Sequence, residues 1–258
     1  MSENTALKHY FGVELARRLS SLIEPHFPNF PSDSFIESVA NQVEPLALKG
    51  RVTVISDELR IALPSDYSES LSILLKILGR ENETEQGMFT NGYFLMPVAY
   101  FVEKYGLQHF EISMNALYEI TKRHTSEYAV RPYLANSPNE CLIYLNNWLY
   151  DPNPHVRRLV SEGTRPRLPW AKRMHAIKGD PANNLNLLAP LLKDPSDYVR
   201  KSVANHLNDL TKDYRDVTLD WLRCLNLEDA DIKWIIRRGL RSLASSEDSE
   251  ALELLAKL

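Results

Sequence analysis

Two acidic residues, Glu162 inside a basic segment of the sequence and Asp209 beyond its end, are candidates for chemistry on a polyanion. Residues 122–180 carry 10 Lys and Arg against 5 Asp and Glu, although the chain as a whole has a net charge of −4. A basic segment inside an acidic protein is the footprint of a localised polyanion site, such as one for DNA. Because carboxylates repel phosphates, their presence beside this segment indicates a separate task, and carboxylates in a cleft are candidate catalysts.

The task that suits a fixed carboxylate is the stabilisation of positive charge that develops during a reaction. At about 4 Å from such a charge it is worth ~4 kcal/mol at an effective dielectric of 20, which is roughly three decades of rate. A carboxylate can also hold an attacking water molecule. The alternative, that Glu162 and Asp209 only pair with nearby arginines, remains open at this stage.

The stretch from Asp151 to Trp170 must position Glu162. Its two prolines set a turn, and a short basic helix is expected over Val156–Glu162, with Arg158 and Glu162 on one face. Gly163 is expected to end that helix in a left-handed cap. The following Arg-Pro-Arg-Leu-Pro-Trp run predicts a stiff, cationic loop that ends at Trp170.

The second half of the chain repeats itself. Residues 149–158 and 192–201 match at a spacing of 43, and 225–233 is a weaker copy. Each unit reads as a helix, an Asp-Pro turn and a second helix beginning with Val-Arg, a pattern typical of HEAT-type repeats. We therefore predict an all-α fold, a curved α-α superhelix (solenoid) whose second helices line a concave groove. Arg157 and Arg200 are expected to pair with turn acids of neighbouring repeats.

Alignment of the repeats predicts where the two carboxylates point. Glu162 corresponds to Asn205 and to Arg238 in the following units, and Asp209 lies one helical turn beyond Asn205. Glu162 and Asp209 should therefore project from adjacent second helices into one groove. Trp148, Trp221 and Trp234 lie on apolar helix faces and are expected to be core residues.

The first half also reads as helices. They are expected at residues 5–24, from 32 to about 48 with Gly50 as the stop, after N-caps at Asp57 and Asp66, and at about 92–105, 109–122 and 126–134. Arg51–Ile55 is the one run that favours a strand. We predict one domain over residues 1–258, with a helical cap at 1–60 and groove-forming repeats at 90–245.

Several classes of protein are disfavoured by the composition. No apolar run reaches the roughly 20 residues of a membrane span, and residues 1–5 lack the pattern of a signal peptide. Cys141 and Cys224 form no CxxC pair and are expected to be thiols in a reducing cytoplasm. The seven His show no ligand spacing, so neither a metal nor another cofactor is expected.

The runs 155–170 and 203–209 closely resemble the AlkC branch of the bacterial HEAT-like DNA alkylation repair glycosylases. The likeness covers most of the chain and is strongest at about 120–212, where Ser-Glu-Gly-Thr-Arg-Pro-Arg is not generic HEAT sequence. It implies a monofunctional glycosylase of base excision repair that removes cationic 3-methyladenine and 3-methylcytosine from duplex DNA without base flipping. Some relatives carry a C-terminal β-sandwich, which is not expected here because the chain ends in helix.

The resemblance also implies roles for individual residues. The essential acids look like Glu162 and Asp209, with Glu127 in support, and the aromatic that probes the groove looks like Trp170. We assign Glu162 to stabilisation of the oxocarbenium ion and Asp209 to water positioning, although the two roles are exchangeable. The expected DNA contacts are Arg158, Arg165, Arg167, Trp170, Lys172, Arg173, Lys201, Asn205 and Arg238.

Two other functions remain open. A non-catalytic HEAT scaffold would bind DNA or an acidic protein, and both carboxylates would then be dispensable. A hydrolase of free cationic nucleosides would accept methylated nucleosides as competing substrates. The partner expected under the repair hypothesis is double-stranded alkylated DNA, bound by a monomer in the cytoplasm at the nucleoid.

Overall fold

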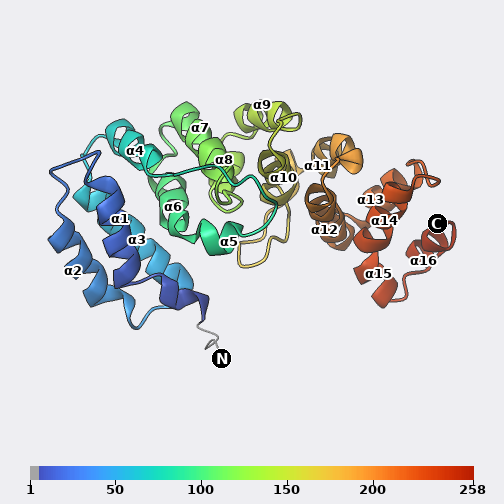
Figure 1. Ribbon diagram of the computed structural model, residues 1–258. Coiled ribbons are helices and arrows are strands. Elements are labelled where there is room, and N and C mark those ends of the chain that lie inside the picture. Colours follow the sequence, from blue (N-terminus) through green and yellow to red (C-terminus); the bar gives the residue numbers. More distant parts are fainter. Residues whose placement is uncertain (1–5) are drawn as a thin grey trace. The chain divides into compact units, whose positions relative to one another are not determined.

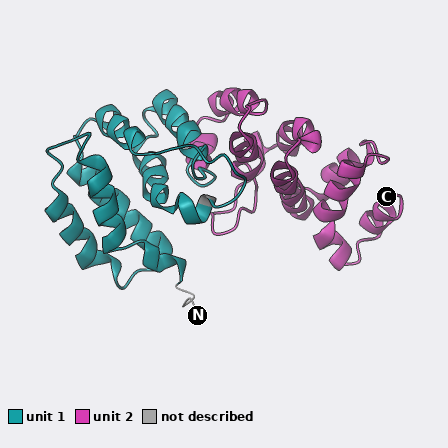
Figure 2. Cartoon of the chain, viewed as in Figure 1, with its two compact units in different colours: residues 1–130 teal, residues 131–258 magenta. Residues whose placement is uncertain are grey.

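A computed structural model of the chain describes residues 6–258, and within this range every regular element is a helix (Figure 1). The predicted all-α class is therefore confirmed. Residues 1–5 lie outside the described residues. They include the start of the first predicted helix and the stretch that lacks a signal-peptide pattern. The fold comprises two compact units, residues 1–130 and 131–258 (Figure 2).

The first unit is built from antiparallel helices around an apolar core. Helix α3 packs against α2 and α6, and α1 packs against α2. Phe11, Phe35 and Phe101 are among its fully buried side chains. Its elements are η1 (Leu7–Tyr10), α1 (Val13–Ile23), α2 (Ser32–Val43), α3 (Leu48–Ala62), α4 (Tyr67–Lys76), α5 (Met88–Asn91), η2 (Tyr93–Leu95), α6 (Met96–Tyr105) and α7 (Phe110–Thr121).

Three local predictions that concern α3 are wrong. Gly50 does not end a helix but lies in the first turn of α3, and the β-leaning run Arg51–Ile55 is helical. Asp57 is not an N-cap, because it lies inside α3 and accepts hydrogen bonds from Lys104 and from Tyr105 Oη at 2.6 Å each. The cap predicted at Asp66 is confirmed, since its side chain accepts from Glu69 N at 2.8 Å.

The second unit contains the repeated helix pairs. The pairs are α9 with α10, α11 and η4 with α12, and α13 with α14. Helix α12 packs between α10 and α14, so consecutive second helices are neighbours. Its elements are α8 (Val130–Asn136), α9 (Pro138–Trp148), α10 (Pro154–Gly163), η3 (Ile177–Gly179), α11 (Pro181–Leu188), η4 (Ala189–Lys193), α12 (Asp197–Asp213), α13 (Arg215–Arg223), α14 (Ala230–Gly239), α15 (Arg241–Ser245) and α16 (Ser249–Ala256).

The turns explain why the second helices start where they do. The side chains of Asn153, Ser196 and Asp229 cap α10, α12 and α14 by accepting backbone N–H groups of the first turn. The predicted structural role of Arg157 is confirmed, because it donates two hydrogen bonds to Asp194 of the next repeat, at 2.6 and 2.9 Å. Arg200 pairs with Asp197 of its own helix and lies 3.4 Å from Asp231, in the first turn of α14. These contacts fix the register between neighbouring repeats.

Candidate active site between two repeat helices

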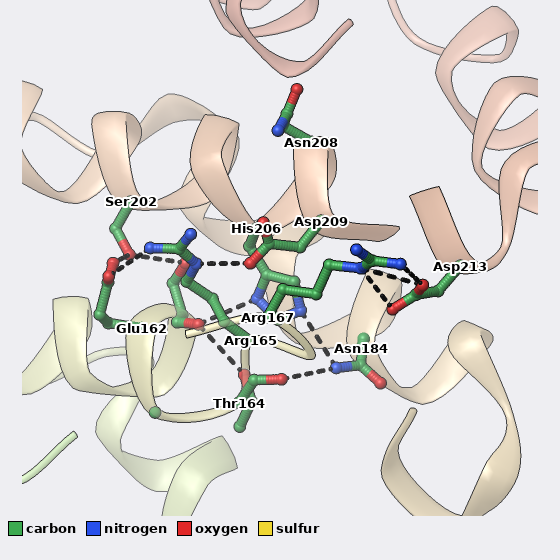
Figure 3. Close-up of polar contacts among 12 residues, drawn as sticks. Glu162, Thr164, Arg165, Arg167, Asn184, Ser202, His206, Asn208, Asp209 and Asp213 are labelled. Atoms are coloured by element: carbon green, nitrogen blue, oxygen red, sulfur yellow. Dashed lines mark hydrogen bonds and ion pairs between the residues drawn. The ribbon is translucent and has the colours of Figure 1, made fainter. Parts of the chain in front are cut away.

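Glu162 and Asp209 meet on a single guanidinium group. Glu162 lies in the last turn of α10, and Asp209 lies in the second half of α12. Arg165, in the loop after α10, donates from Nη1 to Glu162 Oε1 at 2.6 Å and from Nε to Asp209 Oδ2 at 2.8 Å (Figure 3). The structure thus brings together the two carboxylates that repeat alignment placed side by side.

The cluster is buried. Glu162 is 5% exposed, Asp209 is 3% exposed and Arg165 is 7% exposed. Arg158, one turn before Glu162 on α10, places Nη2 3.6 Å from Glu162 Oε1. Two carboxylates and two guanidinium groups therefore balance in charge, as buried ions must.

The two carboxyl groups differ in proton affinity. Burial raises the pKa of Glu162, but Arg158, Arg165 and a hydrogen bond from Ser202 outweigh burial, so its pKa lies below the usual range. Burial also raises the pKa of Asp209, and there the hydrogen bond and charge of Arg165 offset burial only in part, so that its pKa lies above the usual range. The Glu162 carboxylate therefore stays ionised to lower pH than an ordinary glutamate, and the Asp209 carboxylate binds a proton more readily than an ordinary aspartate.

Arg165 is placed differently from its predicted role as a DNA contact. A stiff cationic loop was expected to expose it, but Arg165 is only 7% exposed and its guanidinium lies between two carboxylates. The reason is tertiary. Arg131 donates to the carbonyl oxygens of Gly163, Arg165 and Lys172 at 3.3, 2.7 and 2.7 Å, which folds the loop back over the end of α10. Gly163 ends α10 as predicted, but without a positive φ.

A second ion-pair cluster holds the outer part of the loop. Asp213, in the last turn of α12, accepts from Arg167 Nη2 at 2.6 Å and also pairs with Arg173. Arg167 keeps 37% of its side chain exposed. Between these two arginines, Trp170 is 82% exposed and has a φ of 62°, in the left-handed region that a residue with a Cβ avoids.

The other predicted site residues are distributed over the same unit, except for the supporting acid Glu127. Lys172 and Lys201 are exposed, and Asn205 is half-buried on α12. Arg238 is half-buried on α14, where its guanidinium carbon lies 5.8 Å from the ring centre of Trp234. Glu127 belongs to the first unit, where it is buried and accepts from Thr125 Oγ1 at 3.0 Å.

Not all of the tryptophan predictions hold. Trp148 is buried as predicted and Trp221 is half-buried. Trp234 is 44% exposed, so its assignment to the core is wrong. Its place four residues before Arg238 lets the indole stack against that guanidinium at the surface of α14.

Some site residues were missed by sequence reasoning. Arg131 carries a signal, since it follows a valine as the repeat arginines do. Asp213 lies one helical turn beyond Asp209 and was within reach of the same alignment. Ser202 donates to Glu162 Oε2 at 2.5 Å. The sequence gives no sign of this contact, because a serine inside a helix usually has no specific partner outside its own helix.

Residues 6–258 contain no group of three or more His, Cys, Asp or Glu side chains that could hold a metal ion. No helix in the same range has the length and apolar character needed to cross a membrane.

Known proteins resemble this chain over nearly its whole length. Residues 122–243 match the family described as "DNA alkylation repair enzyme". The chain is 38% identical to the uncharacterized protein YhaZ of Bacillus subtilis over 253 residues, which cover 96% of this chain and 67% of YhaZ. It also matches the Pseudomonas fluorescens alkylpurine DNA glycosylase AlkC, whose structure was solved bound to DNA containing an abasic site analog.

The match to AlkC has a TM-score of 0.87 and 35% sequence identity, and it covers 98% of this chain and 69% of that chain. At this level of likeness the predicted fold of HEAT-like repeats is confirmed. The span matched to the family includes Glu162, Arg165 and Asp209. The chain therefore belongs to the DNA alkylation repair enzyme family, in the branch that contains AlkC.

Proposed function

We propose that this protein is a monofunctional DNA glycosylase that hydrolyses the N-glycosidic bond of cationic, N3-alkylated bases in duplex DNA. Its substrates would be 3-methyladenine and 3-methylcytosine, removed without base flipping. The observation that carries the proposal is the pair of carboxylates, Glu162 and Asp209, that converge on Arg165, a residue of the basic segment 122–180. Membership of the alkylation repair family and the likeness to AlkC support it.

The groups that are present support the proposed substrate class. A ring nitrogen that has been alkylated makes the base cationic and a good leaving group, so no general acid has to protonate it. As the bond to the sugar breaks, positive charge develops on the deoxyribose. A site that already stabilises one buried guanidinium between two carboxylates has the field that such a cation needs.

The pKa directions support one division of roles between the two carboxylates. Glu162, whose pKa is lowered by Arg158 and Arg165 against the effect of burial, remains anionic and stabilises the oxocarbenium ion electrostatically. Asp209, whose pKa is raised by burial, is the better proton acceptor and would hold the attacking water. Glu127 remains a supporting candidate.

DNA would be held by cations of the second unit. Arg165 is not among the DNA contacts that we propose, because its guanidinium is buried between Glu162 and Asp209. Trp170 would probe the groove of the duplex from its exposed place between Arg167 and Arg173. Binding by such cations releases counterions and weakens steeply with salt. The remaining contacts that we propose are Arg158, Arg167, Lys172, Arg173, Lys201, Asn205 and Arg238.

The decisive experiment is incubation with methylated duplex DNA, followed by chromatography of the released bases. We expect 3-methyladenine and 3-methylcytosine to appear, and Glu162→Gln to slow their release by about a hundredfold or more while DNA binding is retained. Complete absence of base release by the wild-type protein would refute the proposal. The protein would then be better described as a scaffold that binds DNA or an acidic protein.

A further inference from the structure

A buried set of neutral polar groups lies behind Glu162, on the side away from its arginines. Ser202 of α12 donates its hydroxyl to Glu162 Oε2 at 2.5 Å. Its oxygen is also 3.0 Å from Ser161 Oγ on α10. Ser161 and Ser202 are 0% and 2% exposed, so water does not compete for these bonds. Arg158 and Arg165 both approach the other oxygen, Oε1.

The direction of each hydrogen bond follows from the number of protons. A serine hydroxyl has one proton, and the proton of Ser202 goes to the carboxylate, which can only accept. The contact between the two serines therefore has Ser161 as donor and Ser202 as acceptor. This relay, from Ser161 to Ser202 to Glu162, polarises each successive bond and strengthens the last one.

His206 fixes the backbone at the start of this relay. The Ser161 carbonyl oxygen can only accept, so His206 Nδ1 must donate to it, at 2.9 Å. Burial, followed by the charge of Arg165, lowers the pKa of His206 to about 3, so the ring is neutral and Nε2 is an acceptor. Asn184 supplies the matching donor at 3.1 Å, and its second amide proton goes to the Thr164 carbonyl at 3.0 Å (Figure 3).

We propose that Ser202, supported by Ser161 and His206, is a positioning residue that holds the Glu162 carboxylate in its reactive orientation. The proposal rests on the glycosylase function stated above. Three points fix the carboxylate: the helix backbone, the arginines on Oε1 and the serine on Oε2. A carboxylate that is already held in place needs no reorganisation when charge develops on the sugar.

The charges that act on Glu162 are few, which makes the contribution of Ser202 measurable. They are Arg158 from its own helix and Arg165 from the loop, and Arg165 is shared with Asp209 of α12. Of the other helices that pack on α10, α11 has no charged residue, and the one charged residue of α9, Glu140, is exposed. The Ser202 hydrogen bond acts in the same direction as the two arginines and lowers the pKa of Glu162.

The test compares Ser202→Ala with Ser202→Cys in the full-length protein. Cysteine keeps the side-chain volume but is a weak donor, so it separates loss of the hydrogen bond from loss of packing. We expect both variants to release 3-methyladenine about tenfold more slowly in single turnovers, with the acidic limb of the rate profile moved to higher pH. Affinity for the methylated duplex should not change.

Ser113→Ala is the matched control. Ser113 is a fully buried serine of α7 that donates to the Gly106 carbonyl at 2.9 Å, far along the chain from Glu162. Its replacement should lower stability without moving the pH profile. Ser161→Ala should shift the profile in the same direction as Ser202→Ala, but by less, because it only weakens the relay.

The outcomes separate this inference from the proposed function. A Ser202→Cys protein with the rate and pH profile of the wild type would show that the hydroxyl only fills space, and the inference would fail. If the wild-type protein released no base, the proposed function would fail instead. The pKa of Glu162, measured by carbon NMR on labelled protein, would still decide the inference, which requires that pKa to rise in Ser202→Ala.

Discussion

Two aspartates of α12, Asp209 and Asp213, are one helical turn apart, and each accepts from an arginine of the same loop. Arg165 pairs with Asp209 and Arg167 pairs with Asp213, at 2.8 and 2.6 Å. The inner pair is buried on both sides, whereas Arg167 keeps 37% of its side chain in solvent. Arg165 also pairs with Glu162, and Asp213 also pairs with the exposed Arg173. Arg165, Asp209 and Glu162 form the inner cluster, and Arg167, Arg173 and Asp213 form the outer cluster.

The difference in burial gives the same pairing two physical roles. At the inner site the charges cannot be screened by water, so each group depends on its partners and can exert a strong field on a bound molecule. At the outer site solvent screens the charges and the pair mainly restrains the loop. Under the proposed function, the inner cluster would therefore act in catalysis, and the outer cluster would hold Trp170 and the arginines for DNA.

The largest expected effect is on stability. Arg165→Ala leaves two buried carboxylates without their shared partner, which should lower the free energy of unfolding by about 3–5 kcal/mol. Arg167→Ala breaks a partly solvated pair and should lower it by less than about 1 kcal/mol. Urea denaturation at neutral pH measures both. Equal losses in the two variants would contradict the distinction between the clusters.

The next effect is on catalysis. Asp209→Asn removes the base that would hold the water, so single-turnover release of 3-methyladenine should fall by about a hundredfold or more, which corresponds to ~2.7 kcal/mol. Asp213→Asn makes the same chemical change one turn later on the same helix and serves as the matched control. Its rate with saturating enzyme should stay within a few-fold of the wild type. If Asp213→Asn were as slow as Asp209→Asn, the inner cluster would lose its special role.

The sequence predicted which helices are neighbours and which carboxylates they bring together, but not the contacts of Arg165 with those carboxylates. The 43-residue spacing placed α10 and α12 side by side, and register within the repeats brought Glu162 and Asp209 together. The role of Arg165 escaped prediction because it depends on the loop path, which Arg131 sets through three carbonyl contacts from 32 to 41 residues away. No local pattern records such contacts.

The same limit explains the errors in α3. Asp57 has the residue type of an N-cap and was interpreted as one, but its partners, Lys104 and Tyr105, lie 47 and 48 residues further along the chain. Gly50 and the β-branched residues after it weaken helix propensity, yet α3 packs against both α2 and α6. Burial of its apolar face outweighs these local preferences. Propensity was a good guide only where tertiary contacts agreed with it.

The stability of the folded chain should depend on pH through His206, which donates to the carbonyl oxygen of Ser161 beside Glu162. The pKa of His206, about 3 in the folded chain, lies below its usual value of 6.5, chiefly because of burial. Between these values the unfolded chain binds a proton that the folded chain does not, so stability rises with pH through this window. This contribution is fully present above pH 6.5 and is lost as the pH falls toward 3.

His206→Asn removes this titration while leaving an amide donor near the Ser161 carbonyl. The variant should be less stable at pH 7, and its stability should fall less steeply between pH 6.5 and 4, by up to about 1.4 kcal/mol per pH unit. Denaturation curves at several pH values measure the slope. The exposed His175, changed to Asn, is the control. A slope in His206→Asn equal to that of the wild type would contradict the assignment of a neutral buried ring.

The smallest expected effect on stability concerns Trp170, in the loop between Arg167 and Arg173 of the outer cluster. Its φ of 62° is strained for any residue with a Cβ, and its ring is too exposed to repay that strain by packing. Trp170→Gly should therefore be more stable than Trp170→Ala, by about 1 kcal/mol in denaturation measurements. Both variants lose the ring, so both should bind methylated duplex about tenfold more weakly. If the glycine variant is no more stable than the alanine variant, the backbone at Trp170 is unstrained. If both bind DNA as the wild type does, the loop is not the groove probe, and the outer cluster has only a structural role.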